Sequence, residues 1–223
     1  MTAPATPPAP DGSYLALPPG GAGPGVLVLH AWWGLNGTFR AVCDRLAAEG
    51  YVALAPDLYG GAAAATIDEA KALMTAAEHD FPRTRALVEG AVAALCAHPA
   101  TRGDGVGVVG FSMGVYWAML MATERPSDIA AVVTFYGGGE GDFARARAAF
   151  LGHYAEGDEW EPDEQVRQLE GDIRAAGREV EFHTYPGAKH WFFEPDRPEH
   201  DPAATALAWE RTLAFLRRHL REH

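Results

Sequence analysis

A serine lies at the centre of a short glycine-bounded run that could carry out nucleophilic chemistry. The run GFSMG at 110–114 follows the apolar stretch 106–109 and places Ser112 at its middle. This pattern is typical of a strand that turns sharply into a helix, with the serine at the apex of a nucleophile elbow. The flanking glycines let strand and helix pass closely while the serine adopts a strained backbone. Because any glycine-rich turn can hold a serine, the run needs catalytic partners elsewhere in the chain.

An acid and a histidine follow two later strands, where partners of the serine would be expected. A serine hydroxyl is nearly all neutral at pH 7, so it needs a base within hydrogen-bonding reach. Asp158 follows the predicted strand 150–154, and His190 follows the predicted strand 179–185. In open α/β sheets, catalytic groups lie beyond the carboxyl ends of the strands. His190 would take the proton of Ser112 and return it to the leaving group, while Asp158 would orient the imidazole.

Backbone N–H groups near the serine would complete the machinery as an oxyanion hole. The N–H of Met113, which follows the nucleophile, is one predicted donor. The second is expected in the loop after the first parallel strand, at Ala31 or Trp32, and we assign it to Trp32. Together these donors would stabilise the charge that develops on the substrate oxygen.

Other acids and histidines compete for the two catalytic positions. Asp163 and Asp172 are predicted at the start and on the exposed face of a helix. His183 lies inside a predicted strand, and His153 and His200 are less well placed than His190. Position in a loop after a strand therefore favours Asp158 and His190.

The elements that must position these side chains alternate along the chain. Strands are predicted at 13–17, 25–30, 51–55, 106–109, 129–136, 150–154 and 179–185. Helices are predicted at 38–49, 67–77, 83–97, 113–123, 163–176 and 202–220. Such alternation indicates right-handed βαβ units and a mostly parallel sheet between helices, an α/β fold. We expect one domain over 13–223, preceded by a flexible tail at 1–12 that is rich in alanine and proline.

Composition excludes several classes of function. The chain has 223 residues, a formal charge of -12 and only two lysines, Lys71 and Lys189, so no basic stripe can bind nucleic acid. It has no signal-peptide pattern and no run of membrane-span length, which fits a cytoplasmic protein without a membrane partner. Cys43 and Cys96 lie in predicted helices and are expected to be buried. No metal-ligand spacing is present, and we expect no metal and no cofactor.

With these residues in place, the chain resembles the dienelactone hydrolase family, the carboxymethylenebutenolidases and their relatives, from about Val26 to Leu216. The resemblance is carried by LHAWWGLN at 29–36, APDLYG at 55–60, GFSMG at 110–114, GD at 157–158 and HWF at 190–192. It implies a single-domain α/β-hydrolase fold with helices on both faces of a mostly parallel central sheet and no cap domain. Asp57, in the second motif, is interpreted as a structural residue of its turn.

Three positions depart from the family pattern. Family members typically carry cysteine where this chain has Ser112, and commonly a glutamate that contacts the resting thiol where it has Ala31. The two changes are consistent, because a serine has no thiol to regulate. Dienelactone hydrolases also carry an arginine four residues after the catalytic histidine, which helps to hold the substrate carboxylate. Glu194 stands there in this chain and is expected to repel an anionic substrate.

The sequence therefore predicts a cofactor-independent serine hydrolase that cleaves small, neutral or apolar esters or lactones through an acyl-enzyme. One alternative is a true dienelactone hydrolase that binds an anionic lactone elsewhere, and another is a non-catalytic binding protein on the same scaffold. Candidate pocket residues, each of which could pack in the core instead, are Ala31, Trp33, Tyr116, Trp160, Trp191 and Phe192. The expected partner is a small-molecule substrate, and the oligomeric state stays open.

Overall fold

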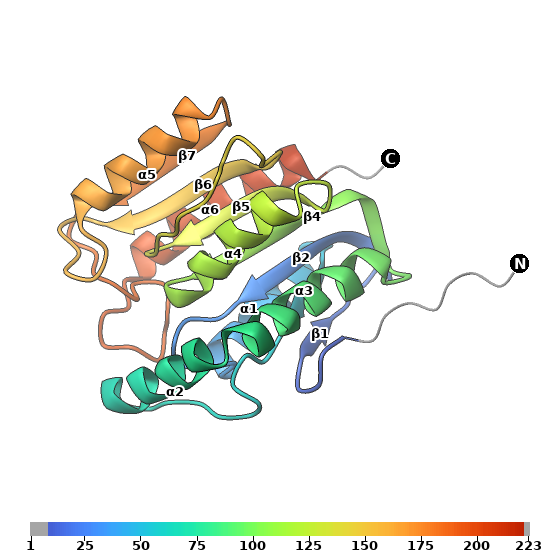
Figure 1. The fold of residues 1–223 in the computed structure, drawn as a ribbon, viewed down its shortest axis with the longest axis horizontal. Helices are drawn as coiled ribbons and strands as arrows, with labels where there is room; N and C mark the ends of the chain where they lie inside the picture. Colours follow the sequence, from blue (N-terminus) through green and yellow to red (C-terminus); the bar gives the residue numbers. More distant parts are fainter. Residues whose placement is uncertain (1–8, 221–223) are drawn as a thin grey trace, which may run out of the picture. The chain divides into compact units, whose positions relative to one another are not determined.

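The strands and helices alternate through most of the chain, as expected. The computed structural model describes residues 9–220, and Figure 1 shows its elements in chain order. The strands are β1 (Tyr14–Ala16), β2 (Gly23–Leu29), β3 (Val52–Ala55), β4 (Thr101–Phe111), β5 (Ile129–Phe135), β6 (Ala149–Ala155) and β7 (Val180–Tyr185). The helices are α1 (Gly37–Ala48), α2 (Ile67–His79), α3 (Phe81–Ala97), α4 (Met113–Glu124), α5 (Asp163–Ala175) and α6 (Pro202–His219). Hydrogen bonds join the strands in the order β1-β3-β2-β4-β5-β6-β7. The predicted α/β fold with a mostly parallel sheet is confirmed.

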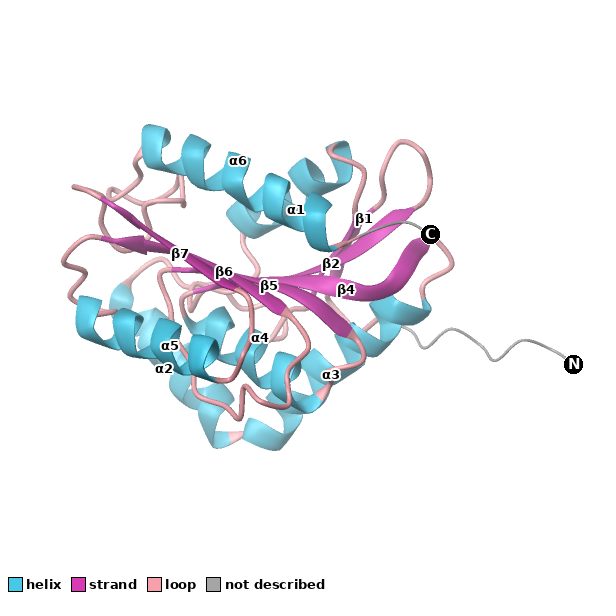
Figure 2. Cartoon of the chain, turned by 90° about the horizontal axis from the view of Figure 1, so that it is seen from above, coloured by secondary structure: helices cyan, strands magenta, loops and turns pink. Residues whose placement is uncertain are grey.

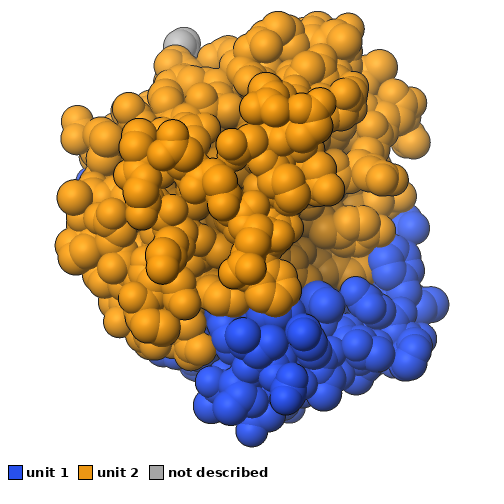
Figure 3. All heavy atoms as spheres, turned by 90° about the vertical axis from the view of Figure 1, so that its left-hand side faces the viewer, with its two compact units in different colours: residues 1–28, 32–106, 222–223 blue, residues 29–31, 107–221 orange. Residues whose placement is uncertain are grey.

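The described residues group into two compact units, which Figure 3 colours separately. Unit 1 comprises residues 9–28 and 32–106, and unit 2 comprises residues 29–31 and 107–220. Each unit has its own strands and helices, and the two are described separately below.

In unit 1, β2 pairs with β3 in parallel and β1 pairs with β3 antiparallel. All residues of β2 and β3 are buried, as expected for apolar runs with helices on both faces. Helix α1 packs against β1 and β3, whereas α3 packs on β3 and α2 packs on α3. Asp57 lies in the turn after β3, where its carboxylate accepts hydrogen bonds from the backbone N–H groups of Tyr59 and Gly61. These bonds agree with the structural role predicted for Asp57.

In unit 2, β5, β6 and β7 form parallel neighbours, and helices cover both faces of these strands. Figure 2 shows α6 on one face and α4 and α5 on the other. All residues of β6 and nearly all of β5 are buried, so these strands form the core beneath the loops that carry the predicted catalytic residues. Because the strands run in parallel, the loops that follow β5, β6 and β7 emerge at the same edge of the sheet.

Two differences from the expected elements have a clear physical cause. Strand β4 begins at Thr101, five residues before the predicted start at Val106. The sequence prediction missed these five residues because they are exposed or half-buried and carry no apolar pattern. Cys43 is buried as expected, but the prediction for Cys96 was wrong, since its side chain is exposed near the end of α3. Helical periodicity alone does not tell which side of a weakly amphipathic helix meets solvent.

Some expectations fall outside what the structure describes. Residues 1–8 of the tail predicted over 1–12 lie outside the described residues, and the single domain predicted over 13–223 stays a prediction. Between residues 9 and 220, no helix has both the length and the apolar composition needed to cross a bilayer.

Candidate active site

Ser112 lies at the sharp turn between β4 and α4 and has a strained backbone. Its φ of 47° and ψ of -115° fall where side chains other than glycine are rarely found. Such a conformation costs on the order of 1–3 kcal/mol and persists only where the surroundings impose it. Here the Ser112 N–H donates to the Phe135 carbonyl at 2.9 Å, and the Ser112 carbonyl accepts from the Val115 N–H at 2.9 Å. The turn has the geometry expected of a nucleophile elbow.

Three glycines let the backbone pack this closely around Ser112. A Cβ at Gly114 would collide with the carbonyl oxygens of Leu29 and His30, and a Cβ at Gly110 would collide with the backbone at Gly114. These two are the glycines of the sequence motif. The third is Gly137, just after β5, where a Cβ would collide with the backbone of Ser112. The motif gives no sign of Gly137, because it lies on a different strand.

The structure brings Ser112, His190 and Asp158 into one hydrogen-bonded chain. Ser112 Oγ lies 3.1 Å from His190 Nε2, and His190 Nδ1 lies 2.7 Å from Asp158 Oδ2. A carboxylate can only accept, so Nδ1 carries the ring proton and donates it to Asp158. In the neutral ring Nε2 is then an acceptor, ready to take the proton of the serine hydroxyl. Ser112 is partly exposed, whereas the side chains of His190 and Asp158 are only 7% and 1% exposed.

The second oxygen of Asp158 is held by the backbone of its own loop. Oδ1 accepts from the N–H of Trp160 at 2.8 Å and from that of Glu161 at 3.4 Å. These bonds fix the carboxylate plane, so that Oδ2 faces the imidazole. A tight turn after β6, with Gly157 at a φ of 65°, brings Asp158 to this position.

A further carboxyl group, Glu161, lies close to Asp158. Burial and, to a lesser extent, the negative charge of Asp158 together raise the pKa of Glu161 to about 7. Glu161 was not singled out from the sequence, because it lies in an ordinary acidic loop.

Aromatic rings surround the His190 imidazole. The ring centroid of Tyr136 lies 5.0 Å from that of His190, and the ring of Trp191 meets it edge-on at 4.9 Å. Trp160 lies at 6.2 Å. Trp191 has a φ of 63° and Tyr136 a φ of 39°, so strained backbone flanks the histidine on two sides. Packing on several sides restricts the rotation of the imidazole.

A cavity of about 400 Å³ opens beside the Asp158–His190 pair. Its walls include Asp158 and His190 together with Trp160 and Trp191. The remaining lining is charged or small, with three carboxylates against one ammonium group: Glu156, Glu159, Glu199 and Lys189. This space is large enough for part of a small ligand.

The predicted pocket residues lie in different surroundings. Trp160, which is 41% exposed, and Trp191 line this cavity. Tyr116 is 40% exposed on the first turn of α4 and packs edge-on against Trp117. Phe192 is fully buried among aromatic rings, and Ala31 is buried at the end of β2. Trp33 is buried in unit 1 against Trp32.

The predicted oxyanion donors belong to different units. Met113 is the first residue of α4 and therefore stands at a helix N-terminus, where the backbone dipole favours negative charge. Trp32 belongs to unit 1. Both assignments stay predictions. In the part of the chain that the structure describes, no group of three or more His, Cys, Asp or Glu side chains could hold a metal ion.

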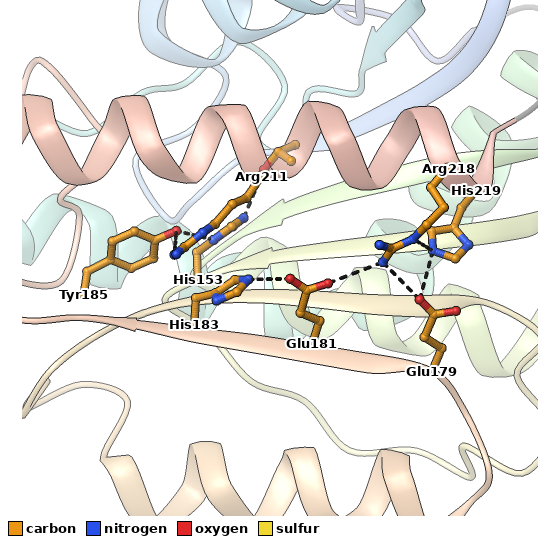
Figure 4. Close-up of polar contacts among 9 residues, drawn as sticks. His153, Glu179, Glu181, His183, Tyr185, Arg211, Arg218 and His219 are labelled. Carbon is orange, nitrogen blue, oxygen red and sulfur yellow. Dashed lines mark hydrogen bonds and ion pairs between the residues drawn. The ribbon is translucent and has the colours of Figure 1, made fainter.

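Two of the histidines that competed with His190, namely His153 and His183, take part in polar contacts among β6, β7 and α6 (Figure 4). His153 is buried and shares hydrogen bonds with Tyr185 at 2.8 Å and Thr212 at 3.0 Å. Burial lowers its pKa well below the ordinary value, so the ring stays neutral. His183 pairs with Glu181 at 2.7 Å on the edge strand β7. Glu181 also pairs with Arg218 of α6, and Glu179, just before β7, pairs with both Arg218 and His219.

The expectation that Glu194 repels an anionic substrate was wrong. Glu194 is fully buried, and its Oε1 accepts a hydrogen bond from the Tyr136 hydroxyl at 2.8 Å. Burial raises the pKa of this carboxyl to about 8, so it is mostly neutral at pH 7. A neutral, inward-facing group cannot repel a ligand by charge. Neither Tyr136 nor the burial of Glu194 could be read from the sequence, although Tyr136 directly precedes a run of three glycines.

Comparisons with known proteins agree with this architecture. The model of the dienelactone hydrolase family matches residues 12–220. "Protein usf" of Aquifex pyrophilus is 34% identical over 215 residues, covering 93% of each chain. A protein of Aquifex aeolicus (strain VF5) named "Putative carboxymethylenebutenolidase" is 32% identical over 216 residues, again covering 93% of each. The crystal structure of a "Putative Dienelactone Hydrolase" from Klebsiella pneumoniae subsp. pneumoniae MGH 78578 has a TM-score of 0.80 and 26% identity over 91% of each chain. The chain therefore belongs to the dienelactone hydrolase family and is an ester hydrolase.

Proposed function

We propose that this enzyme hydrolyses small, uncharged carboxylic esters or lactones with Ser112 as nucleophile, His190 as general base and acid, and Asp158 as the orienting carboxylate. The observation that carries the proposal is the hydrogen-bonded chain from Ser112 Oγ through both ring nitrogens of His190 to Asp158 Oδ2. Family membership supports ester hydrolysis, and the chain of hydrogen bonds supports these roles for the three residues.

In the first half of the reaction, Ser112 Oγ attacks the carbonyl carbon of the ester while His190 Nε2 takes the hydroxyl proton. The imidazolium that forms is stabilised by Asp158, which remains ionised. The tetrahedral oxyanion would be stabilised by the N–H of Met113 and by a second donor, assigned to Trp32. Collapse of the intermediate breaks the bond to the alcohol oxygen, which takes the proton from Nε2. The acyl group stays on Ser112.

In the second half, water replaces the alcohol. His190 Nε2 removes a proton from this water as its oxygen attacks the acyl carbon, and then returns the proton to Ser112 Oγ. The carboxylic acid leaves and the enzyme returns to its starting state. Because a lactone is a cyclic ester, the same steps open it to a hydroxy acid.

Charge around the cavity supports an uncharged substrate. Besides Asp158, three carboxylates and one ammonium group line the space beside His190, and the whole chain carries a formal charge of -12. Such a field disfavours the approach of anions. The rings of Trp160 and Trp191 offer an apolar surface for a flat or aliphatic group of the ester.

A fluorophosphonate probe tests the proposal directly. We expect the probe to label Ser112 in the folded enzyme and labelling to be lost in His190→Ala, because the hydroxyl then lacks its base. Peptide mapping by mass spectrometry identifies the labelled residue. His183→Ala is the matched control, since that histidine pairs with Glu181 and should leave labelling intact. A folded wild-type enzyme that takes up no probe would favour a non-catalytic binding protein.

An anionic lactone is the second candidate substrate. The burial of Glu194 makes this substrate more favourable than the sequence alone indicated. With that carboxyl neutral and turned inward, one electrostatic objection to a carboxylate-bearing dienelactone disappears. We still expect neutral aryl esters to give a higher kcat/KM than the anionic lactone, because of the acidic cavity rim. Steady-state rates on matched neutral and anionic substrates decide, and the reverse order would support a true dienelactone hydrolase.

A further inference from the structure

One contact beside His190 is used neither by the hydrogen-bonded chain nor by the cavity. Tyr136 directly follows β5, is fully buried, and packs its ring at 5.0 Å from the imidazole of His190, tilted by 57°. Its hydroxyl donates to Glu194 Oε1 at 2.8 Å. Glu194 lies four residues after His190 in the same loop. The hydrogen bond therefore joins the end of β5 to the segment that carries the histidine.

Both ends of this hydrogen bond are anchored in the backbone. The Tyr136 N–H donates to the His153 carbonyl in β6 at 2.8 Å, although the residue has a strained φ of 39°. The Glu194 N–H donates to the Trp191 carbonyl at 2.9 Å, and the Glu194 carbonyl accepts from Arg197 at 3.0 Å. Side chains fixed at both ends transmit position well, because neither can shift without breaking further bonds.

Burying a carboxyl group in this place lowers the stability of the fold unless both of its oxygens are hydrogen-bonded. Glu194 is 0% exposed, and its second oxygen, Oε2, has no hydrogen-bond partner among residues 9–220. A leucine or methionine would avoid that cost, since a buried polar atom without a hydrogen-bond partner is destabilising. What an apolar residue cannot do is accept the Tyr136 hydroxyl. The carboxyl is therefore suited to holding that ring.

We propose that Tyr136 and Glu194 form a positioning pair that holds the His190 imidazole in the plane in which it meets Ser112 and Asp158 together. The ring of Tyr136 packs against one side of the imidazole, and Glu194 holds that ring in place by accepting the hydrogen bond of its hydroxyl. Both are positioning residues, because neither would touch the reacting atoms. This inference rests on the proposed function, since it assigns the pair a role through His190.

The test compares rates of fluorophosphonate labelling and steady-state kinetics in matched variants. We expect Tyr136→Phe, which keeps the ring and removes its tether, to lower the labelling rate and kcat about 10- to 100-fold with KM unchanged, since small misplacements of catalytic groups have effects of this size. Glu194→Gln keeps a carbonyl acceptor and should stay within about twofold of wild type. Glu194→Met removes the acceptor and should match Tyr136→Phe.

A buried tyrosine elsewhere in unit 2 gives the control. Tyr154 in β6 shares a hydrogen bond with Thr134 at 3.1 Å, and its ring packs against Phe182. Tyr154→Phe removes a buried hydroxyl of the same kind, so it should cost similar stability in a thermal melt while kcat and the labelling rate stay at wild-type values. A kcat loss in both tyrosine variants would mean that the effect is only structural and would overturn the proposal.

Further outcomes separate the proposal from the proposed function. A folded Tyr136→Phe that is labelled at the wild-type rate overturns the positioning role while leaving the serine hydrolase intact. Absence of labelling in the wild type contradicts the hydrolase itself. If Tyr136→Phe does not fold, the double variant Tyr136→Phe, Glu194→Met, which leaves no polar atom unpartnered, takes its place. Glu194→Gln also decides, because a loss as large as that of Glu194→Met contradicts the role of the acceptor.

Discussion

Replacing Ser112 with alanine is expected to lower kcat by about 10⁴- to 10⁶-fold, as for the nucleophile of other hydrolytic triads. The Oγ that attacks the substrate and accepts the acyl group is removed, and His190 has no hydroxyl to deprotonate. Binding should change little, because removing one hydroxyl leaves the rings of Trp160 and Trp191 in place beside His190. Hydrolysis of a chromogenic aryl ester, followed under single-turnover and steady-state conditions, measures the loss.

Ser127→Ala provides the comparison for this variant. Ser127 is exposed and its hydroxyl donates to the neighbouring Asp128 at 3.3 Å, so its loss should leave kcat unchanged. A folded Ser112→Ala enzyme that retained more than about one-hundredth of the wild-type kcat would assign the nucleophile to another residue.

Replacing Asp158 with asparagine is expected to lower kcat by about 10⁴-fold, which is the cost of the equivalent change in other Ser-His-Asp enzymes. The backbone N–H groups of Trp160 and Glu161 require an acceptor, so the amide oxygen would face them and the amide NH₂ would face His190. Nδ1 must then accept, which places the ring proton on Nε2. In that tautomer His190 cannot take the proton of Ser112. Kinetics on the same aryl ester, with a thermal melt to show folding, give the result.

Asp163→Asn is the matched control for Asp158→Asn. Asp163 lies five residues later, at the start of α5, and its carboxylate accepts a hydrogen bond from the N–H of Gly157 at 3.2 Å. It was a competing candidate from the sequence, so the pair of variants also discriminates between the two acids. Equal losses in both variants would contradict the assignment of Asp158.

Much of this architecture was predictable because it follows from local pattern. The apolar runs that became β2, β5 and β6 identify themselves, since strands covered on both faces must be apolar throughout. Glycines at 110 and 114 signal the elbow for a steric reason that holds in any sequence. Asp158 and His190 follow strands in the sequence, and parallel topology brings the ends of those strands together.

The features that escaped prediction all depend on contacts between distant segments. Gly137 and Tyr136 follow β5, and nothing in their own neighbourhood in sequence indicates that they pack against Ser112 and His190. Glutamate is usually found at the surface, so the sequence gives no sign that Glu194 is buried. Its buried carboxyl is satisfied by a hydrogen bond from the Tyr136 hydroxyl, which belongs to a distant segment. Charge in a sequence is a count of groups, whereas charge in a fold depends on which groups retain their protons.

The buried carboxyl of Glu194 couples the folding of this chain to acidity. In the native chain its pKa is about 8, whereas the ordinary value is 4.5. At neutral pH the native molecule therefore holds a proton that the denatured molecule gives up to the buffer. The contribution of this group to the free energy of unfolding is fully present below about pH 4.5. It decreases as the pH rises from about 4.5 to the native pKa of about 8. Unfolding of this acidic enzyme at neutral pH is therefore expected to release the proton of the Glu194 carboxyl to the solvent.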